Sequence, residues 1–346
     1  MSNVGKKRDI AQAIRNADEV TNKILANVEL REEEFPFAPA EWLPSRDVDM
    51  LRRVRAVKQE DMEYTNANGY QVQLLANPTF MYVLDCYNRI VESDREDKIF
   101  TMICPNQWPG PYQALATMIN RNNVSCRNVH AFAMDEWADA DGNVAPLTYG
   151  AGLGYSFIKH FYMQIREDLR PPLDHWHVFT TENYKYFSDI IEDIGEGGAD
   201  VCYSATGWPG HIAFIDPMTK EFAADSIEEF LEMGSRFVLQ HPLTVCENSL
   251  FAPMGASGDV WAVPPGSVTI GPRDVANARY RLEMHNIVFT GGVDSWQRMI
   301  SRIELYGPVS MDCPASIVKL FPGNCYVSYE IARPFDLWRE NQNIFA

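Results

Sequence analysis

A segment near the middle of the chain, residues 201–217 (VCYSATGWPGHIAFIDP), joins a strand-like run to side chains that can move protons. The apolar run ends in a turn that contains Gly207 and Pro209, and His211 follows this turn. Asp216 comes a few residues later, where it can orient the imidazole or fix its tautomer. Ligands of open α/β sheets bind outside the carboxyl ends of the strands, so this turn is expected at a site. The alternative is a histidine that only caps the turn.

A second group of acidic residues follows the strand expected over residues 128–134. Asp135 and Glu136 stand at its carboxyl end. A carboxylate at the mouth of a buried strand is partly desolvated, which raises its pKa toward neutrality and suits Asp135 to move a carbon-bound proton. The alternative is a carboxylate that caps a helix. We expect Asp135, Glu136, His211 and Asp216 to be catalytic.

A third strand end, after residues 98–104, carries polar and aromatic side chains in the turn PNQWPGP. In a parallel sheet, the carboxyl ends of the strands lie on one edge, so this turn is expected to meet the other two groups. The residues expected to bind substrate are Asn106, Gln107, Trp108, Gly110, Gly207 and Trp208.

Strand and helix patterns alternate from about residue 78 onward. Strands are expected at 98–104, 128–134, 175–179, the start of 201–217, 267–271, 287–290 and 325–329. Helices are expected at 80–91, 112–120, 155–165, 185–194, 225–233 and 295–305. This alternation predicts an α/β fold with a mainly parallel sheet and helices on both faces.

The first 75 residues have a different pattern from the rest of the chain. Apolar residues recur at helical spacing from Ile10 to Leu25, a charged helix is expected over residues 48–64, and strand runs are lacking. We therefore expect a helical arm over residues 1–75 that packs on the core or on a neighbouring subunit. The remainder, 76–346, is expected to form one α/β domain because no glycine- or serine-rich linker divides it.

Composition limits the compartment and the partners. The chain has 346 residues and a formal net charge of −17, which argues against a nucleic-acid-binding surface. Seven dispersed cysteines without a CxxC pair indicate reduced thiols in a cytoplasmic protein. The amino terminus has no apolar core of signal-peptide length, and no apolar run is long enough to span a membrane. No metal-ligand spacing and no nucleotide-binding motif is evident, so neither a metal nor a cofactor is expected.

Four sequence blocks carry a family resemblance: FAMDEW, YSFIKHFY, ATGWPGHIAFIDP and VPPGSVTIGPRDVANA, in this order. They resemble the glucosamine-6-phosphate deaminase/isomerase family, whose wider superfamily includes the 6-phosphogluconolactonases. The resemblance covers roughly residues 78–335 and implies a Rossmann-like sheet, a homo-oligomer and an aldose–ketose isomerisation coupled to ammonia release. By position, Asp135 matches the aspartate that moves a proton between C2 and C1, and His211 matches the ring-opening histidine. Asp216 stands where the deaminases carry a glutamate.

The departures from the family pattern concern the relay acid and the phosphate ligands. Pro209 stands where the deaminases carry an aspartate, and proline cannot accept a proton. The family's Gly-Gly-Thr-Pro phosphate turn is replaced by residues 106–111, in which two prolines offer no N–H donor. Residues 248–250 and 291–294 contain no cation near the family's arginine and lysine positions. Arg236 or Arg273 could replace these cations from elsewhere.

The combined pattern predicts an isomerase or deaminase-like enzyme that acts on an amino sugar or related sugar, with altered or absent phosphate recognition. The alternatives are a non-catalytic sugar-binding homologue and a lactone hydrolase, for which Asp135 would be dispensable. The expected partner is a small-molecule sugar or sugar phosphate, with no nucleic acid and no membrane. A homo-oligomer is also expected, because the helical arm has an apolar stripe that could meet a second copy or fold back on its own core.

Overall fold

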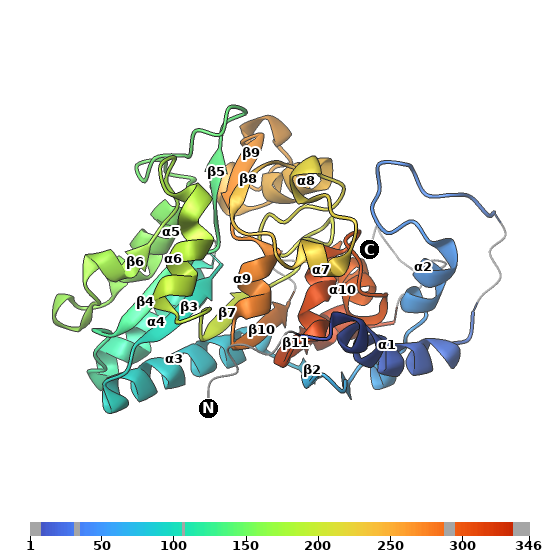
Figure 1. Cartoon of the computed structure of the whole chain (residues 1–346), viewed down its shortest axis with the longest axis horizontal. Coiled ribbons are helices and arrows are strands. Elements are labelled where there is room, and N and C mark those ends of the chain that lie inside the picture. The colour runs from blue at the N-terminus through green and yellow to red at the C-terminus, as the bar shows by residue number, and fades with distance from the viewer. Residues whose placement is uncertain (1–7, 31–34, 106–107, 287–294, 335–346) are drawn as a thin grey trace, which may run out of the picture.

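The computed structural model describes residues 8–30, 35–105, 108–286 and 295–334. A sheet of eight strands runs through the centre of the molecule, and all its neighbouring strands pair in parallel except β1 and β2. Its order is β1 (Tyr64–Thr65), β2 (Tyr70–Leu75), β11 (Gly323–Ser328), β10 (Tyr280–His285), β7 (Val201–Ser204), β3 (Phe100–Cys104), β4 (Val129–Ala133) and β6 (Trp176–His177). Helices cover both of its faces (Figure 1).

A second, smaller sheet stands at the carboxyl edge of the first (Figure 1). It contains β5 (Asp135–Ala138), β9 (Gly266–Thr269) and β8 (Arg236–Leu239), all antiparallel. The chain passes from β4 to β5 through Met134, whose carbonyl accepts a hydrogen bond from the Ile270 N–H. Asp135 therefore lies at the junction of the two sheets.

The helices contact alternate side chains of the strands, because successive residues of a strand point to opposite faces. On β10, the Tyr280 ring lies under the Arg89 guanidinium of α3, whereas Arg281 points to the other face and bonds to carbonyls of α9. The α-helices are α1 (Ile10–Ala26), α2 (Val48–Arg55), α3 (Pro78–Glu96), α4 (Pro109–Asn122), α5 (Leu153–His160), α6 (Phe187–Ile194), α7 (Ile227–Phe230), α8 (Pro242–Ser249), α9 (Pro272–Asn277), α10 (Gln297–Tyr306) and α11 (Tyr329–Ala332). The longest 3-10 segment is η9 (Pro314–Leu320).

Most elements expected from the sequence are present. The strands expected at 98–104, 128–134, 201–217 and 325–329 are β3, β4, β7 and β11, and the six expected helices correspond to α3–α7 and α10. The strand expected at 267–271 is β9, but it belongs to the antiparallel sheet. The strand expected at 175–179 is reduced to the two residues of β6. The strand expected at 287–290 lies outside the described residues.

The expectation that residues 1–75 lack strands is wrong. β2 forms a parallel ladder with β11, and β1 turns back onto β2, so residues 64–75 extend the main sheet. The two expected helices are present as α1 and α2. α1 packs its apolar stripe against α10 and η9 of its own chain, with Ala17, Thr21 and Leu25 buried. The division into an arm and a domain stays a prediction.

Among the described residues, no helix combines the length and the apolar character that crossing a membrane requires.

Candidate active site

A cavity of about 380 Å³ opens where the carboxyl ends of β3, β4, β7 and β10 meet. Its polar lining includes Asp135, His211 and Glu247, which belong to segments far apart in the chain. Its remaining walls are largely apolar and aromatic, including Trp108, Met134, Leu153, Phe214, Phe251, Met284 and Trp296. A concave, mainly apolar pocket with a few converging titratable groups has the form of a small-molecule site.

The turn after β7 places His211 in this cavity. The N–H of Gly207 donates to the carbonyl of His211 at 3.1 Å, and the N–H of Gly210 donates to the carbonyl of Gly207 at 2.9 Å. Gly210 has φ +92°, in the region that favours glycine. Gly207 is required for space, because a Cβ there would lie 1.9 Å from Nε2 of His211. The tight turn therefore brings the imidazole directly against the backbone of Gly207.

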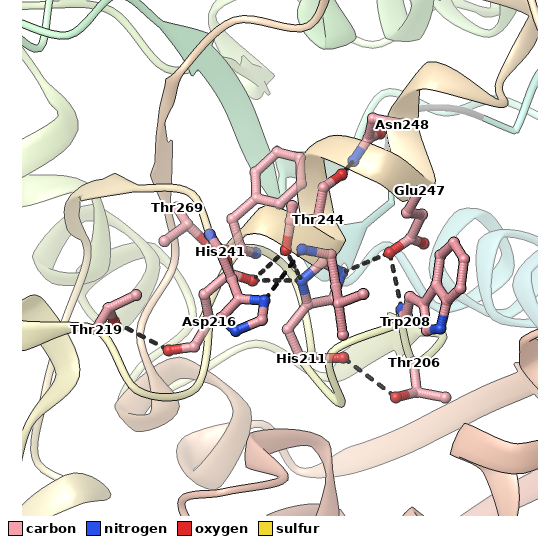
Figure 2. Close-up of polar contacts among 12 residues, drawn as sticks. Thr206, Trp208, His211, Asp216, Thr219, His241, Thr244, Glu247, Asn248 and Thr269 are labelled. Atoms are coloured by element: carbon pink, nitrogen blue, oxygen red, sulfur yellow. Dashed lines mark hydrogen bonds and ion pairs between the residues drawn. The ribbon is translucent and has the colours of Figure 1, made fainter. Parts of the chain in front are cut away.

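Asp216 holds one edge of the His211 ring. Its Oδ1 lies 2.6 Å from Nδ1 of His211 and accepts the Thr244 hydroxyl at 2.8 Å, while Oδ2 accepts the His241 backbone N–H at 2.7 Å. The Asp216 side chain is fully buried, so these donors replace the water that a carboxylate otherwise needs. Because Nδ1 donates to Asp216, Nε2 is the ring nitrogen left for proton exchange, and it points toward Glu247, another lining residue (Figure 2).

The charge of the imidazole follows from its neighbours. Burial lowers the pKa of His211, but the hydrogen bond and the charge of Asp216, with the charges of Glu247 and Asp135, outweigh this and raise it above the ordinary value. His211 is thus held toward its protonated form near neutral pH, as a group that can donate a proton from Nε2.

Asp135 and His211 come together as the sequence predicts. Asp135 is 8% exposed, lines the same cavity, and is close enough for its charge to raise the pKa of His211. A carboxylate and an imidazole facing one cavity provide two separate proton-exchanging groups.

Glu136 is not brought into the cavity. Its Oε1 accepts the N–H groups of Trp137 at 2.8 Å and Leu153 at 2.9 Å, and its Oε2 accepts that of Gly154 at 2.7 Å. Burial raises the pKa of Glu136, and these three N–H groups oppose the rise by favouring the carboxylate. The side chain anchors the start of α5 behind Asp135, which is the positioning role of a helix cap.

Of the residues expected to bind substrate, Trp108, Gly110 and Gly207 line the cavity. Trp208 does not line it; its ring stacks on Trp296, a lining residue, with centroids 5.8 Å apart. Asn106 and Gln107 lie outside the described residues.

The described lining of the cavity contains no lysine or arginine. Arg236 donates to the carbonyls of Gly234 and Glu221, and Arg273 pairs with Asp189 at 2.6 Å, so the two candidate cations are engaged elsewhere. At the start of α4, Pro109 and Pro111 have no N–H to offer an anion. The described part of the site therefore offers no lysine or arginine to a phosphate, and altered phosphate recognition stays a prediction. Residues 291–294 lie outside the described residues.

Glu247 of α8 is a titratable side chain of the cavity that sequence reasoning missed. Its Oε2 lies 3.7 Å from Nε2 of His211 and accepts the Trp208 N–H at 2.8 Å (Figure 2). Burial raises the pKa of Glu247 to about 7, opposed by the positive charge of His211 and the Trp208 N–H. α8 was not expected from the sequence, although Pro242 at its first turn, directly after His241, is a helix-start signal.

One group of side chains in the described structure could hold a metal ion. Glu283, His285 and Cys325 place donor atoms within 4.8 Å of one another in the core beside α10. Both oxygens of Glu283 already accept hydroxyl donors, Tyr70 at 2.6 Å and Ser204 at 3.0 Å. Nδ1 of His285 lies 2.9 Å from the Ser301 hydroxyl, so Glu283 and this edge of His285 already belong to a buried hydrogen-bonded network.

Comparisons with known proteins agree with this fold. No family model matches the sequence. The chain is similar to the glucosamine-6-phosphate deaminase of Corynebacterium kroppenstedtii, with 26% identity over 222 residues that cover 62% of the chain and 72% of that protein. Among solved structures, a monomeric glucosamine-6-phosphate deaminase matches at a TM-score of 0.58 and 17% identity, over 75% of this chain and 98% of that one. The 6-phosphogluconolactonase of Trypanosoma cruzi matches at a TM-score of 0.51 and 13% identity, over 75% of this chain and 95% of that one.

The Rossmann-like sheet and its matches show that the chain has the α/β fold of these deaminases and lactonases. The chain therefore resembles the glucosamine-6-phosphate deaminases in sequence and in fold.

Proposed function

We propose that this protein is an aldose–ketose isomerase of the deaminase type that acts on an amino sugar without a phosphate group. The observation that carries the proposal is the joint presence of Asp135 and the Asp216-paired His211 in one cavity whose described lining contains no lysine or arginine. His211 serves ring opening, and Asp135 moves the proton between C2 and C1 of the open-chain sugar. This proton shift turns the C2 amine into an imine, and addition of water at C2 then releases ammonia and leaves the ketose carbonyl.

Electrostatics favour an unphosphorylated substrate. A phosphate would share the cavity with the carboxyl groups of Asp135 and Glu247 and would meet no lysine or arginine of the described lining. Charge-assisted hydrogen bonds to phosphate are among the stronger contacts a site can make, so their loss weakens binding substantially. The aromatic rings of Trp108 and Trp296 instead suit the apolar face of a neutral sugar ring or the side of an ammonium group.

The proposal is tested by measuring ketose formation and ammonia release over matched pairs of free and 6-phosphorylated 2-amino-2-deoxyhexoses. We expect kcat/KM for at least one free sugar to exceed that of its phosphate ester by roughly tenfold or more, which corresponds to about 1.4 kcal/mol. Faster turnover of the phosphate ester would contradict the substrate assignment. Absence of turnover of every sugar by folded protein would leave a non-catalytic sugar-binding protein.

The Asp135→Asn variant separates isomerisation from lactone hydrolysis. The substitution keeps the size of the side chain and removes the proton acceptor, so isomerisation should fall by roughly 10²-fold or more. Hydrolysis of a sugar lactone needs no C2 base and would survive in the variant. Lactonase activity that persists in Asp135→Asn, without isomerase activity in the wild type, would favour the hydrolase instead.

A further inference from the structure

Glu247 and Asp216 hold His211 from opposite edges of the imidazole. Asp216 bonds Nδ1, whereas the Glu247 carboxylate stands beside Nε2, at 3.7 Å (Figure 2). Both carboxyl groups are buried, but Glu247 also lines the cavity and Asp216 does not. Glu247 is therefore the acid that can meet a substrate together with His211.

The local structure keeps this arrangement fixed. The Trp208 N–H holds Oε2 of Glu247, and Thr244, one turn earlier on α8, bonds Asp216. Gly207 leaves the space between the two groups: a Cβ there would lie 1.9 Å from Nε2 and 2.7 Å from Oε2. At 3.7 Å the two atoms are too far apart for a direct hydrogen bond, so a substrate hydroxyl can bridge them.

We propose that Glu247 is a catalytic acid–base residue that works with His211 in opening the sugar ring, in place of an acid at the Pro209 position. This inference rests on the proposed function, because it assigns a step of that reaction. Pro209 stands in the same turn, two residues before His211, and has no group that could exchange a proton. α8 supplies the carboxyl group from outside the turn.

The step balances without any further reactant. The Glu247 carboxylate takes the proton of the anomeric hydroxyl, and the O–H electron pair forms the new carbonyl bond. The C–O bond of the ring breaks, and its electron pair goes to the ring oxygen, which takes a proton from Nε2 of His211. Glu247 is then protonated and His211 neutral, and transfer of that proton from Oε2 to Nε2 through a bridging water or sugar hydroxyl restores both groups.

The charges around the pair suit this exchange. The groups that face it are Asp216, Asp135 and His241, which stands at the start of α8. Burial lowers the pKa of His211, but Asp216 and Asp135, with Glu247, raise it overall. Burial lowers the pKa of His241, which keeps it neutral near pH 7. The pKa of Glu247, about 7, lets it accept a proton and return it at neutral pH. Turnover should thus rise as Glu247 ionises through pH 7 and fall where His211 loses its proton, above the ordinary histidine value.

The test compares Glu247→Gln with the wild type on a cyclic amino sugar that the wild type turns over. The glutamine oxygen still accepts the Trp208 N–H but exchanges no proton, so kcat should fall by about 10²-fold or more with KM within about threefold. The rise in kcat through pH 7 should disappear. Asp274→Asn is the matched control: Asp274 is a buried acid of α9 with its pKa raised to about 6 by burial, and it does not line the cavity. The control should keep both the rate and the pH profile.

A second substrate distinguishes ring opening from other roles. An amino aldose in which hydrogen replaces the ring-closing hydroxyls needs no ring opening, so Glu247→Gln should turn it over within about fivefold of the wild-type rate. An equal loss on both substrates, or an unchanged rate on the cyclic sugar, would overturn the role of Glu247 and leave the proposed function standing. Inactivity of the wild type on both substrates would overturn the proposed function itself.

Discussion

At the scale of single residues, the site depends on how closely the Gly207 backbone approaches the His211 ring. The hydrogen bond between Nδ1 and Asp216 fixes one edge of the ring. At the other edge, Nε2 occupies space that is free only because Gly207 has no Cβ. A proton donor displaced by about 1 Å can lose roughly 10²-fold in rate, so this contact controls activity without touching the chemistry itself.

The Gly207→Ala variant tests this dependence. The new methyl group would overlap Nε2 of His211 and push the ring away from both Asp216 and the substrate, so kcat should fall by about 10²-fold or more. Gly207 does not have a positive φ, so alanine is compatible with its backbone and the fold should persist. Gly150→Ala is the control, since no atom lies within 4 Å of its added Cβ. Steady-state kinetics with circular dichroism measure both effects, and unchanged kinetics in Gly207→Ala would contradict the argument.

At the scale of elements, β10 places three ionisable side chains in the core, Arg281, Glu283 and His285. Glu283 of β10 and Glu304 of α10 are both fully buried, and burial raises the pKa of each carboxyl group. Glu283 accepts the hydroxyls of Tyr70 and Ser204, so it is the better placed to remain ionised, with Glu304 as the protonated partner. His285 beside them is neutral, because burial lowers its pKa to about 3.

This network predicts a pH-dependent stability that the Glu304→Gln variant should lose. The folded-state pKa of Glu304 is raised, so the folded protein binds a proton that the unfolded chain releases above its own pKa of about 4.3. The contribution of Glu304 to stability is thus greatest below that pH and decreases as pH rises toward the folded-state pKa, by up to about 1.4 kcal/mol per pH unit. The free energy of unfolding, measured with urea from pH 5 to pH 8, should decrease less steeply with pH for Glu304→Gln than for the wild type. Parallel curves would show that the carboxyl group does not titrate as described.

The sequence predicts those elements whose side chains follow a simple pattern. β3, β4, β7 and β11 are recognised from apolar runs, and the turn before His211 from its glycines and proline. β10 escapes this reasoning because Arg281, Glu283 and His285 resemble an exposed segment; only the packed structure supplies the carbonyls and hydroxyls that satisfy them.

The site residues also divide into those that the sequence predicts and those that only the packed structure brings into place. His211 and Asp216 are close in sequence, and Asp135 follows a recognisable strand, so their grouping could be predicted. Glu247 could not, because its place beside Nε2 depends on how α8 packs over the turn through Thr244 and His241. Glu136 adjoins Asp135, but strand alternation and the N–H groups of α5 direct it away from the cavity.

At the scale of the whole molecule, the first helix of the amino-terminal segment packs on the rest of the chain. α1 packs on α10 and η9, so its apolar stripe is covered by its own chain and no longer indicates a second copy. The loop that follows reaches toward α8, where the Trp42 carbonyl lies 3.2 Å from Nε2 of His241. A homo-oligomer stays a prediction, and its best remaining ground is the exposed apolar part of this loop.

Phe35 and Phe37 offer the contact through which such an oligomer would form. They are 76% and 68% exposed in the single chain, and their rings lie 6.1 Å apart, so together they present one apolar surface. Burying a phenylalanine side chain contributes roughly 1.5–3 kcal/mol, so replacing both with serine should raise the dissociation constant by at least about tenfold. Light scattering over a dilution series measures this change. Trp261→Ser is the control, because Trp261 is 89% exposed on a different segment and its loss should leave the mass unchanged. A wild-type protein that remains monomeric at high concentration, or a double variant with unchanged association, would contradict this assembly.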